Sequence, residues 1–267
     1  MQLPVNTFKQ ALAGSDTLYG IWASLANAYA AEVVATTGYD WMLVDGEHAP
    51  NHVPSMLTQL QAIAPYPSQP VVRAVNGDAT LIKQLLDIGV QTLMVPMVET
   101  AEQAAALVQA TRYPPAGMRG VGGGLTRATR WDSIPNYITT AHEQLCLIVQ
   151  IESRLGVANA AAIAAVEGVD AVFIGPVDLS TNMGYAGDSS QPEVQETIQR
   201  TIETVLAQGK ACGILAPRVD DAKRYAQWGC KFVAIGIDIS LLRQAATQNL
   251  ALHKGQAAPT TSASPTY

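Results

Sequence analysis

The sequence predicts a (β/α)₈ barrel, because three observations agree on it. Short apolar runs rich in β-branched residues alternate with helix-like stretches along the chain of 267 residues. There are eight such runs. A closed barrel of eight parallel strands typically takes about 250 residues, whereas a doubly wound open sheet usually has fewer strands and a Gly-rich first turn. We therefore expect one α/β barrel domain over residues 1–254.

The strand candidates are short runs that would be buried on both faces of a parallel sheet. In chain order they are residues 20–25, 40–46, 69–75, 92–98, 146–152, 171–176, 211–216 and 232–238. Helix-like stretches follow at residues 26–37, 78–88, 100–111, 156–166, 192–208, 219–228 and 239–253. Asp78 and Thr100 stand where N-caps belong, and Gly38 and Gly89 stand just past helix ends. Residues 255–267 lack periodicity and are expected to form a disordered tail.

The composition argues against several classes of partner. With 48% apolar and 14% charged residues, the chain can bury a large core. Its net charge of −6 comes without a basic cluster, so neither nucleic acid nor a membrane surface is expected as a partner. No apolar stretch approaches the roughly 20 residues that cross a bilayer, and the first residues lack a secretory signal. We expect a soluble, cytoplasmic protein whose three isolated cysteines are small buried residues.

Chemically capable side chains follow three of the predicted strands directly. Asp45, Glu47 and His48 come after the apolar run 41–44, and two further carboxylates follow later runs at Glu152 and Asp178. Ligands bind at the carboxyl ends of the strands in parallel α/β folds. These side chains are therefore expected at one end of the barrel, around a common site.

Glu152 and Asp178 are candidate metal ligands. They are 26 positions apart, about one βα unit, so they fall on neighbouring strands. A pair of carboxylates that leaves positions for water suits a hard divalent cation such as Mg²⁺ or Mn²⁺. The alternative is a structural role, since Asp178-Leu-Ser resembles the N-cap of a following helix.

His48 and Arg73 are the other candidates. Among the four histidines, only His48 directly follows a predicted strand, which favours an acid–base role over that of a hydrogen-bonded structural residue. Arg73 ends a strand inside an apolar run, where an unpaired guanidinium is costly, so it needs an anionic partner from the protein or the substrate. No lysine stands at the ligand end of a strand, which makes an imine mechanism improbable.

The longest connection, residues 99–144, contains the Gly-rich segment 113–124. We expect it at the same end as the acidic groups, as a wall of the site; the alternative is a turn-rich connection without a ligand.

Four segments together resemble a known family. They are WMLVDGEHAPN at residues 41–51, RYPPAGMRG at 112–120, VQIE at 149–152 and FIGPVDLS at 173–180. In this order they resemble the signature segments of the HpcH/HpaI aldolases, and the likeness runs over residues 6–253. The resemblance implies a (β/α)₈ barrel that assembles as a hexamer of swapped dimers. It also implies metal-dependent cleavage of 4-hydroxy-2-oxo acids, such as 4-hydroxy-2-oxoheptanedioate from aromatic-acid degradation, to pyruvate and an aldehyde.

The resemblance also implies a role for each site residue. Glu152 and Asp178 would hold Mg²⁺, Mn²⁺ or Co²⁺, and His48 would be the acid–base group. The remaining roles fall to a larger set: enolate stabilisation by Arg73, a partner of His48 in Asp87, and substrate binding by Trp22, Gln150, Val177, Asp178 and Leu215. Val177 would act through its backbone N–H, where related proteins carry Ala.

Three other functions stay open. A 2-keto-3-deoxy sugar-acid aldolase would use the same residues on a different aldehyde. A lyase of malyl- or citramalyl-CoA would share the enolate chemistry but needs basic residues for the nucleotide phosphates, and Lys and Arg are sparse here. A barrel that only binds a small acid is disfavoured, because His48, Arg73, Glu152 and Asp178 are all present.

Overall fold

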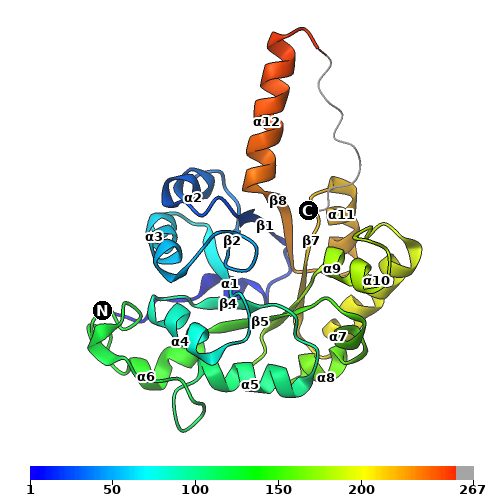
Figure 1. The fold of residues 1–267 in the computed structure, drawn as a ribbon. Coiled ribbons are helices and arrows are strands. Elements are labelled where there is room, and N and C mark those ends of the chain that lie inside the picture. The colour runs from blue at the N-terminus through cyan, green and yellow to red at the C-terminus, as the bar shows by residue number, and fades with distance from the viewer. Residues whose placement is uncertain (257–267) are drawn as a thin grey trace.

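Eight parallel strands close into a barrel in chain order, as the sequence predicted (Figure 1). The computed structural model describes residues 1–256, so most of the predicted tail lies outside the described residues. The strands are β1 (Leu18–Ala23), β2 (Trp41–Asp45), β3 (Gln69–Arg73), β4 (Thr92–Val95), β5 (Cys146–Ile151), β6 (Ala171–Ile174), β7 (Ala211–Leu215) and β8 (Phe232–Ile237). Each pairs with its neighbours in sequence, and β8 closes the barrel on β1.

Helices surround the barrel. They are α1 (Thr7–Ala11), α2 (Ala28–Ala35), α3 (Val53–Ile63), α4 (Ala79–Asp87), α5 (Ala101–Thr111), α6 (Tyr137–Thr140), α7 (Arg154–Ala158), α8 (Ala160–Ala165), α9 (Pro176–Asn182), α10 (Pro192–Ala207), α11 (Val219–Gln227) and α12 (Asp238–His253), with 3₁₀ turns η1 (Gly123–Leu125) and η2 (Ala141–Gln144). None of the described helices is long and apolar enough to cross a membrane.

Aromatic side chains fill the barrel interior. Trp41 and Phe232 pack edge to face with their ring centroids 5.8 Å apart, and Trp22 and Phe173 lie 5.5 Å apart. A Cβ atom at Gly213 would lie 2.4 Å from the Phe232 ring, so glycine is needed there. The centre is therefore a packed core and not a channel, which leaves the two ends of the barrel for ligands.

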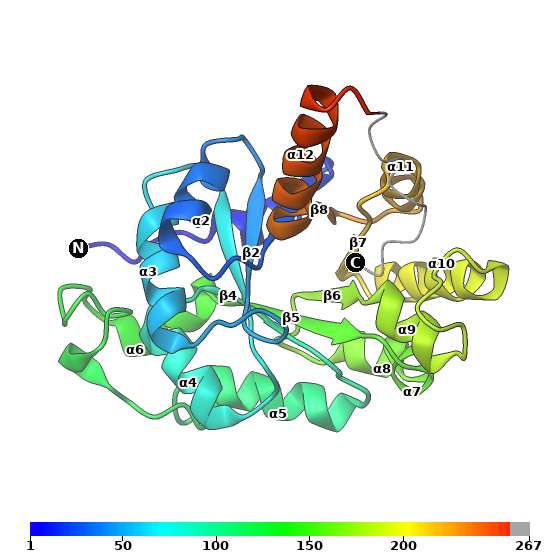
Figure 2. The same cartoon turned by 45° about the horizontal axis from the view of Figure 1, so that its top comes forward.

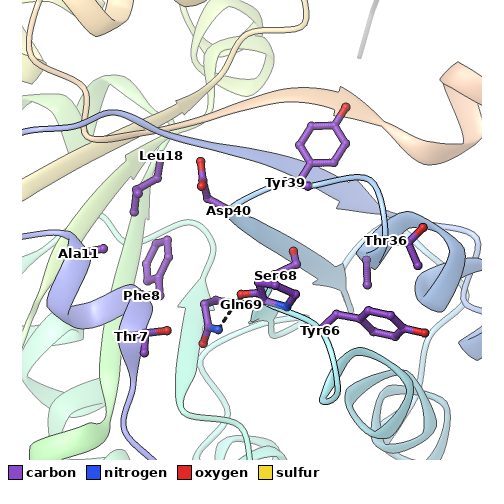
Figure 3. Close-up of a pocket in the computed structure, with 13 residues that line it drawn as sticks. Thr7, Phe8, Ala11, Leu18, Thr36, Tyr39, Asp40, Tyr66, Ser68 and Gln69 are labelled. Atoms are coloured by element: carbon purple, nitrogen blue, oxygen red, sulfur yellow. Dashed lines mark hydrogen bonds between the residues drawn. The ribbon is translucent and has the colours of Figure 1, made fainter.

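The amino end of the barrel carries α1 and the long connection before β5. Phe8 of α1 is buried against Trp41 and Phe232. Beside α1, a recess of about 470 Å³ opens toward the starts of β2 and β3 (Figure 3). The connection begins at the C-terminus of α5 and is tied to this end by the side-chain amide of Asn6, which donates to the carbonyl of Gln144.

The Gly-rich segment 113–124 does not lie at the end of the barrel that carries the acidic site residues, so the prediction that it forms a wall of the site is wrong for a single chain. This segment follows α5 and precedes β5, so it is an αβ connection. In a barrel such connections lie at the amino ends of the strands, because each helix runs antiparallel to its strand. The segment lies against the last turns of α4, near Lys83 and Asp87, and not beside the acidic groups.

The last helix extends away from the rest of the molecule in both views (Figures 1 and 2). Of its sixteen residues only Asp238 and Ala251 are buried. Five large apolar side chains are exposed, at Ile239, Leu241, Leu242, Leu250 and Leu252. A single chain thus leaves α12 without the core that usually stabilises such a helix.

Candidate active site

Arg73 is held by two carboxylates where β2 and β3 end side by side. Asp45 and Arg73 are partners in the strand register. The guanidinium donates from Nε to Oδ1 and from Nη2 to Oδ2 of Asp45, both at 2.8 Å, and Nη1 lies 2.7 Å from Oε2 of Glu47. Burial alone would lower the pKa of Arg73, but the bond to Asp45 and both negative charges raise it. The anionic partner predicted for Arg73 therefore comes from the protein.

Glu152 is buried directly after β5, with 3% of its surface exposed. The backbone N–H of Met97 donates to its Oε1 at 2.8 Å, and Nε2 of Gln150 donates to its Oε2 at 2.6 Å. Burial raises the pKa of Glu152 to about 7; the charges of Asp178 and Glu47 act in the same direction, against the bond from Met97. A carboxylate in this position is costly to ionise unless a cation accompanies it.

Asp178 lies on the next βα unit, in the first turn of α9. The N-cap of α9 is Gly175, so the alternative in which Asp178 caps this helix is wrong. A Cβ atom at Gly175 would lie 2.2 Å from Oε2 of Glu152, so only glycine lets the buried carboxylate stand here. The β6–α9 junction thus brings both predicted metal ligands to one place.

A pocket at this end brings all five predicted substrate-binding residues together. Its lining residues are Trp22, Arg73, Gln150, Phe173, Gly175, Pro176, Val177, Asp178 and Leu215. Arg73 lies over the Trp22 ring, 5.2 Å from the centroid. The side-chain oxygen of Gln150 is buried without a hydrogen-bond partner in the described part of the chain, which leaves it available to a ligand. Sequence reasoning missed Phe173, although the run that contains it was a predicted strand.

His48 lies at the rim, on the loop between β2 and α3. Its side chain is 54% exposed, and Nε2 is 3.8 Å from Oε2 of Glu47. Glu47 therefore stands between Arg73 and His48, a link that sequence reasoning did not find. The apolar run of β2 ends before Asp45, and the loop that follows has no periodicity from which the positions of Glu47 and His48 could be predicted.

Asp87 is not near His48 within one chain. It is the last residue of α4, so it lies at the amino end of the barrel, whereas His48 lies at the carboxyl end. Its Oδ1 accepts a bond of 2.8 Å from Nη2 of Arg119, whose guanidinium lies 4.4 Å from the centroid of the Tyr113 ring. Sequence reasoning did not single out Arg119.

The donor set at Glu152 and Asp178 suits a hard divalent cation. Among the described residues, no cluster of three or more His, Cys, Asp or Glu side chains is placed to hold a metal. Two carboxylates still fit an ion that keeps several positions for water or substrate oxygens. Burial, and after it the charges of Asp178 and Glu47, raise the pKa of Glu152, so a nearby cation would favour its ionised form.

A closed (β/α)₈ barrel with carboxylates and an arginine at its carboxyl end has the architecture of the barrel enzymes, whose active sites lie at that end. The family can also be stated. The chain belongs to the HpcH/HpaI aldolase/citrate lyase family, whose model matches residues 18–245, and it is a carbon–carbon lyase.

Individual relatives agree with this assignment. A hydroxypyruvate/pyruvate aldolase of Delftia acidovorans is 72% identical over 100% of both chains. A 4-hydroxy-2-oxo-heptane-1,7-dioate aldolase of Escherichia coli is 55% identical over 90% of this chain and 92% of its own. The crystal structure of a family member from Burkholderia cenocepacia matches with a TM-score of 0.90 and 40% identity, over 94% of this chain and 100% of the other.

Proposed function

We propose that the protein is a divalent-metal-dependent aldolase. It cleaves a 4-hydroxy-2-oxo acid to pyruvate or hydroxypyruvate and an aldehyde, and it catalyses the reverse addition. The observation that carries the proposal is the buried carboxyl group of Glu152, which interacts with the charge of Asp178, beside a pocket that Asp178 and Arg73 line. The names of the relatives support both the reaction and the choice of 2-oxo acid.

Glu152 and Asp178 would hold the cation, for which Mg²⁺, Mn²⁺ and Co²⁺ are the candidates. When bound, it supplies Lewis-acid polarisation of the 2-oxo group. Arg73 directs positive charge at the oxygen that becomes negative as the enolate forms. Because Asp45 and Glu47 fix its guanidinium from two sides, Arg73 needs little reorganisation in the reaction.

The remaining pocket residues bind and orient the substrate. Val177 is the second residue of α9, and its N–H has no acceptor within the helix, so it is available to the substrate carboxylate. Gln150 offers its unpaired oxygen, and Trp22 and Leu215 provide apolar walls. His48 takes the proton from the 4-hydroxyl in cleavage and returns it in addition, with Glu47 beside its ring.

The alternative substrates differ in how they fit this pocket. A 2-keto-3-deoxy sugar acid needs the same groups and stays a candidate for the aldehyde half. A CoA thioester would need cations for its phosphates, but among the described residues that line this pocket Arg73 is the only Lys or Arg, and it is already paired. This favours a free 2-oxo acid over a thioester.

We also propose that the assembly is the hexamer of swapped dimers that the resemblance implies. The exposed apolar residues of α12 support it, because a second copy would cover them. Asp87 supports it as well, since only a neighbouring subunit could bring this carboxylate to His48. Hydrogen bonding from Arg119 fixes Asp87 and leaves its second oxygen for such a contact.

Release of the 2-oxo acid tests the proposed function. Pyruvate released from 4-hydroxy-2-oxoheptanedioate and from a 2-keto-3-deoxy sugar acid is followed with lactate dehydrogenase, and malyl-CoA serves as the thioester comparison. We expect turnover of at least one free acid, none of the thioester, and loss of turnover in Arg73→Gln. Turnover of the thioester alone would overturn the proposal.

A further inference from the structure

A second polar recess lies at the amino end of the barrel, away from the catalytic pocket. Its volume is about 220 Å³. Basic side chains reach it from four separate segments: Lys9 of α1, Arg112 at the end of α5, His142 of η2 and Lys210 before β7. Within residues 1–256, Asp170 is the only carboxylate that lines it.

The cations of this recess are incompletely neutralised. Lys9 Nζ lies 3.1 Å from Oδ1 of Asp170 and donates to the carbonyl of Leu145 at 2.6 Å. The other oxygen of Asp170 accepts the backbone N–H of Leu147. Lys210 donates to the carbonyl of Val169 at 2.7 Å and keeps two further donors.

Arg112 is the clearest unmet donor. Its side chain makes no ion pair or hydrogen bond with the described residues, although the residue is partly buried; only its backbone carbonyl accepts a bond, from the N–H of Arg119. Its Nη2 lies close over Gly168, where a Cβ atom would be 2.7 Å away. A partly buried guanidinium whose donors have no protein acceptor among the described residues can bind an anion.

The local charge has the opposite sign to that of the whole protein. Three permanent cations and one carboxylate give this recess a charge of +2 with His142 neutral, although the net charge of the chain is −6. The larger recess of Figure 3 is a useful contrast, because Asp40 is its only charged lining residue. An anion is therefore drawn to one side of α1 and not to the other.

We propose that this recess binds a dianionic phosphate group, either inorganic phosphate or the phosphate of a small phosphorylated metabolite. The charge of the ligand matches that of the recess, and Arg and Lys are the side chains that bind phosphate oxygens. Because the contacts come from α1, α5, η2 and the start of β7, the bound group ties α1 and the connection before β5 to the barrel. This binding does not depend on the catalytic metal.

Calorimetry with the full-length protein tests the site. Inorganic phosphate and glycerol phosphate are titrated separately, with chloride at matched ionic strength as reference. We expect saturable binding that is weakened at least about tenfold in Arg112→Gln and in Lys210→Gln. Arg200→Gln is the matched control, because Arg200 is an exposed arginine of α10, and it should bind as the wild type does. Circular dichroism confirms that each variant is folded.

The outcomes separate the possible sources of phosphate. Tighter binding of glycerol phosphate assigns the site to a phosphorylated metabolite, and tighter binding of inorganic phosphate assigns it to the free ion. Unchanged affinity in both folded variants, or no saturation below about 10 mM, overturns the proposal. If the wild-type protein releases no pyruvate from any of the free acids, the proposed function is refuted, and this phosphate-binding result is unaffected.

Discussion

At the residue scale, the proposed metal binding would depend on the proton of Glu152. The carboxyl group is buried, and Asp178 and Glu47 add negative charge around it. Its pKa is therefore raised from the ordinary value of 4.5 to about 7. A cation replaces the proton as the compensating charge, so proton and metal compete for the same oxygens.

This competition predicts a pH dependence of affinity. Below about pH 7 the proton must leave Glu152 before Mn²⁺ binds, so affinity should rise about tenfold per pH unit and then level off above pH 7. Calorimetric titration of the metal-free protein with Mn²⁺, from roughly 1.5 pH units below to roughly 1.5 pH units above the pKa of about 7, measures this pH dependence of affinity. An affinity that is flat across this range would contradict the raised pKa.

The same shift predicts the stability of the metal-free protein. Because the folded state holds this proton more tightly than the unfolded chain, stability falls as pH rises from 4.5 toward about 7, by on the order of 3 kcal/mol. Glu152→Gln removes this titrating group. In urea unfolding, the free energy of unfolding of the variant relative to that of the wild type should therefore increase between these pH values. The variant should also fail to bind Mn²⁺. Equal pH profiles for the two metal-free proteins would count against the assignment.

Sequence reasoning at the residue scale worked best for groups at strand ends. The apolar neighbours of Arg73 predicted that it needs an anion, and Asp45 and Glu47 supply it. The placement of Glu152 and Asp178 followed from one βα unit of spacing. Glu47 as the link to His48 did not follow from any pattern, since loop geometry beyond a strand has no periodicity.

At the scale of elements, the junction of β6 and α9 positions the site. Gly175 ends the strand run and caps the helix, and its lack of a side chain admits the Glu152 carboxylate. Its φ of −91° is accessible to any residue, so the need for glycine is steric and not conformational.

Gly175→Ala should therefore damage the metal site while the fold survives. The added methyl would lie 2.2 Å from Oε2 of Glu152 and force the carboxylate to move. We expect a loss of Mn²⁺ affinity of about 10- to 100-fold. Gly120→Ala is the control, because its Cβ would meet only the flexible side chain of Lys83. Equal losses in both variants would indicate a general disturbance of the protein.

All eight strands were predictable, because buried parallel strands are continuous apolar runs. Helices were harder. The helix α3 was not predicted, although the buried residues Met56, Leu60 and Ile63 have helical spacing and follow the N-cap His52. The predicted helix 156–166 is two helices that meet at Asn159, where the backbone leaves the helical region. The Gly-rich segment was misplaced because the order of helix and loop within the connection was overlooked.

At the scale of the whole molecule, the proposed assembly would bring Asp87 to a neighbouring subunit and would cover the exposed apolar residues of α12. If Asp87 partners the His48 of a neighbour, two inactive variants should rescue each other in mixed assemblies. His48→Ala lacks the acid–base group and should lose about 10²- to 10⁴-fold in kcat. Asp87→Asn removes the negative charge that would support His48 of the neighbouring subunit. Hybrids contain sites with His48 from one chain and Asp87 from the other.

Co-refolding the two variants and measuring kcat tests this arrangement. Activity above the mean of the two separate proteins is expected, whereas additive activity would show that Asp87 does not act across subunits. The double variant refolded with wild type serves as control, because it cannot generate an intact site from two damaged chains.

Carbon–carbon cleavage is expected to depend on a divalent cation held by Glu152 and Asp178. The most direct measurement is pyruvate release by EDTA-treated enzyme as Mn²⁺ is added back, with a parallel sample of enzyme and pyruvate treated with borohydride. We predict no turnover without metal, recovery that saturates with the Mn²⁺ binding isotherm, and no covalent pyruvate adduct. Full turnover in excess EDTA, or pyruvate trapped on a lysine, would contradict the account.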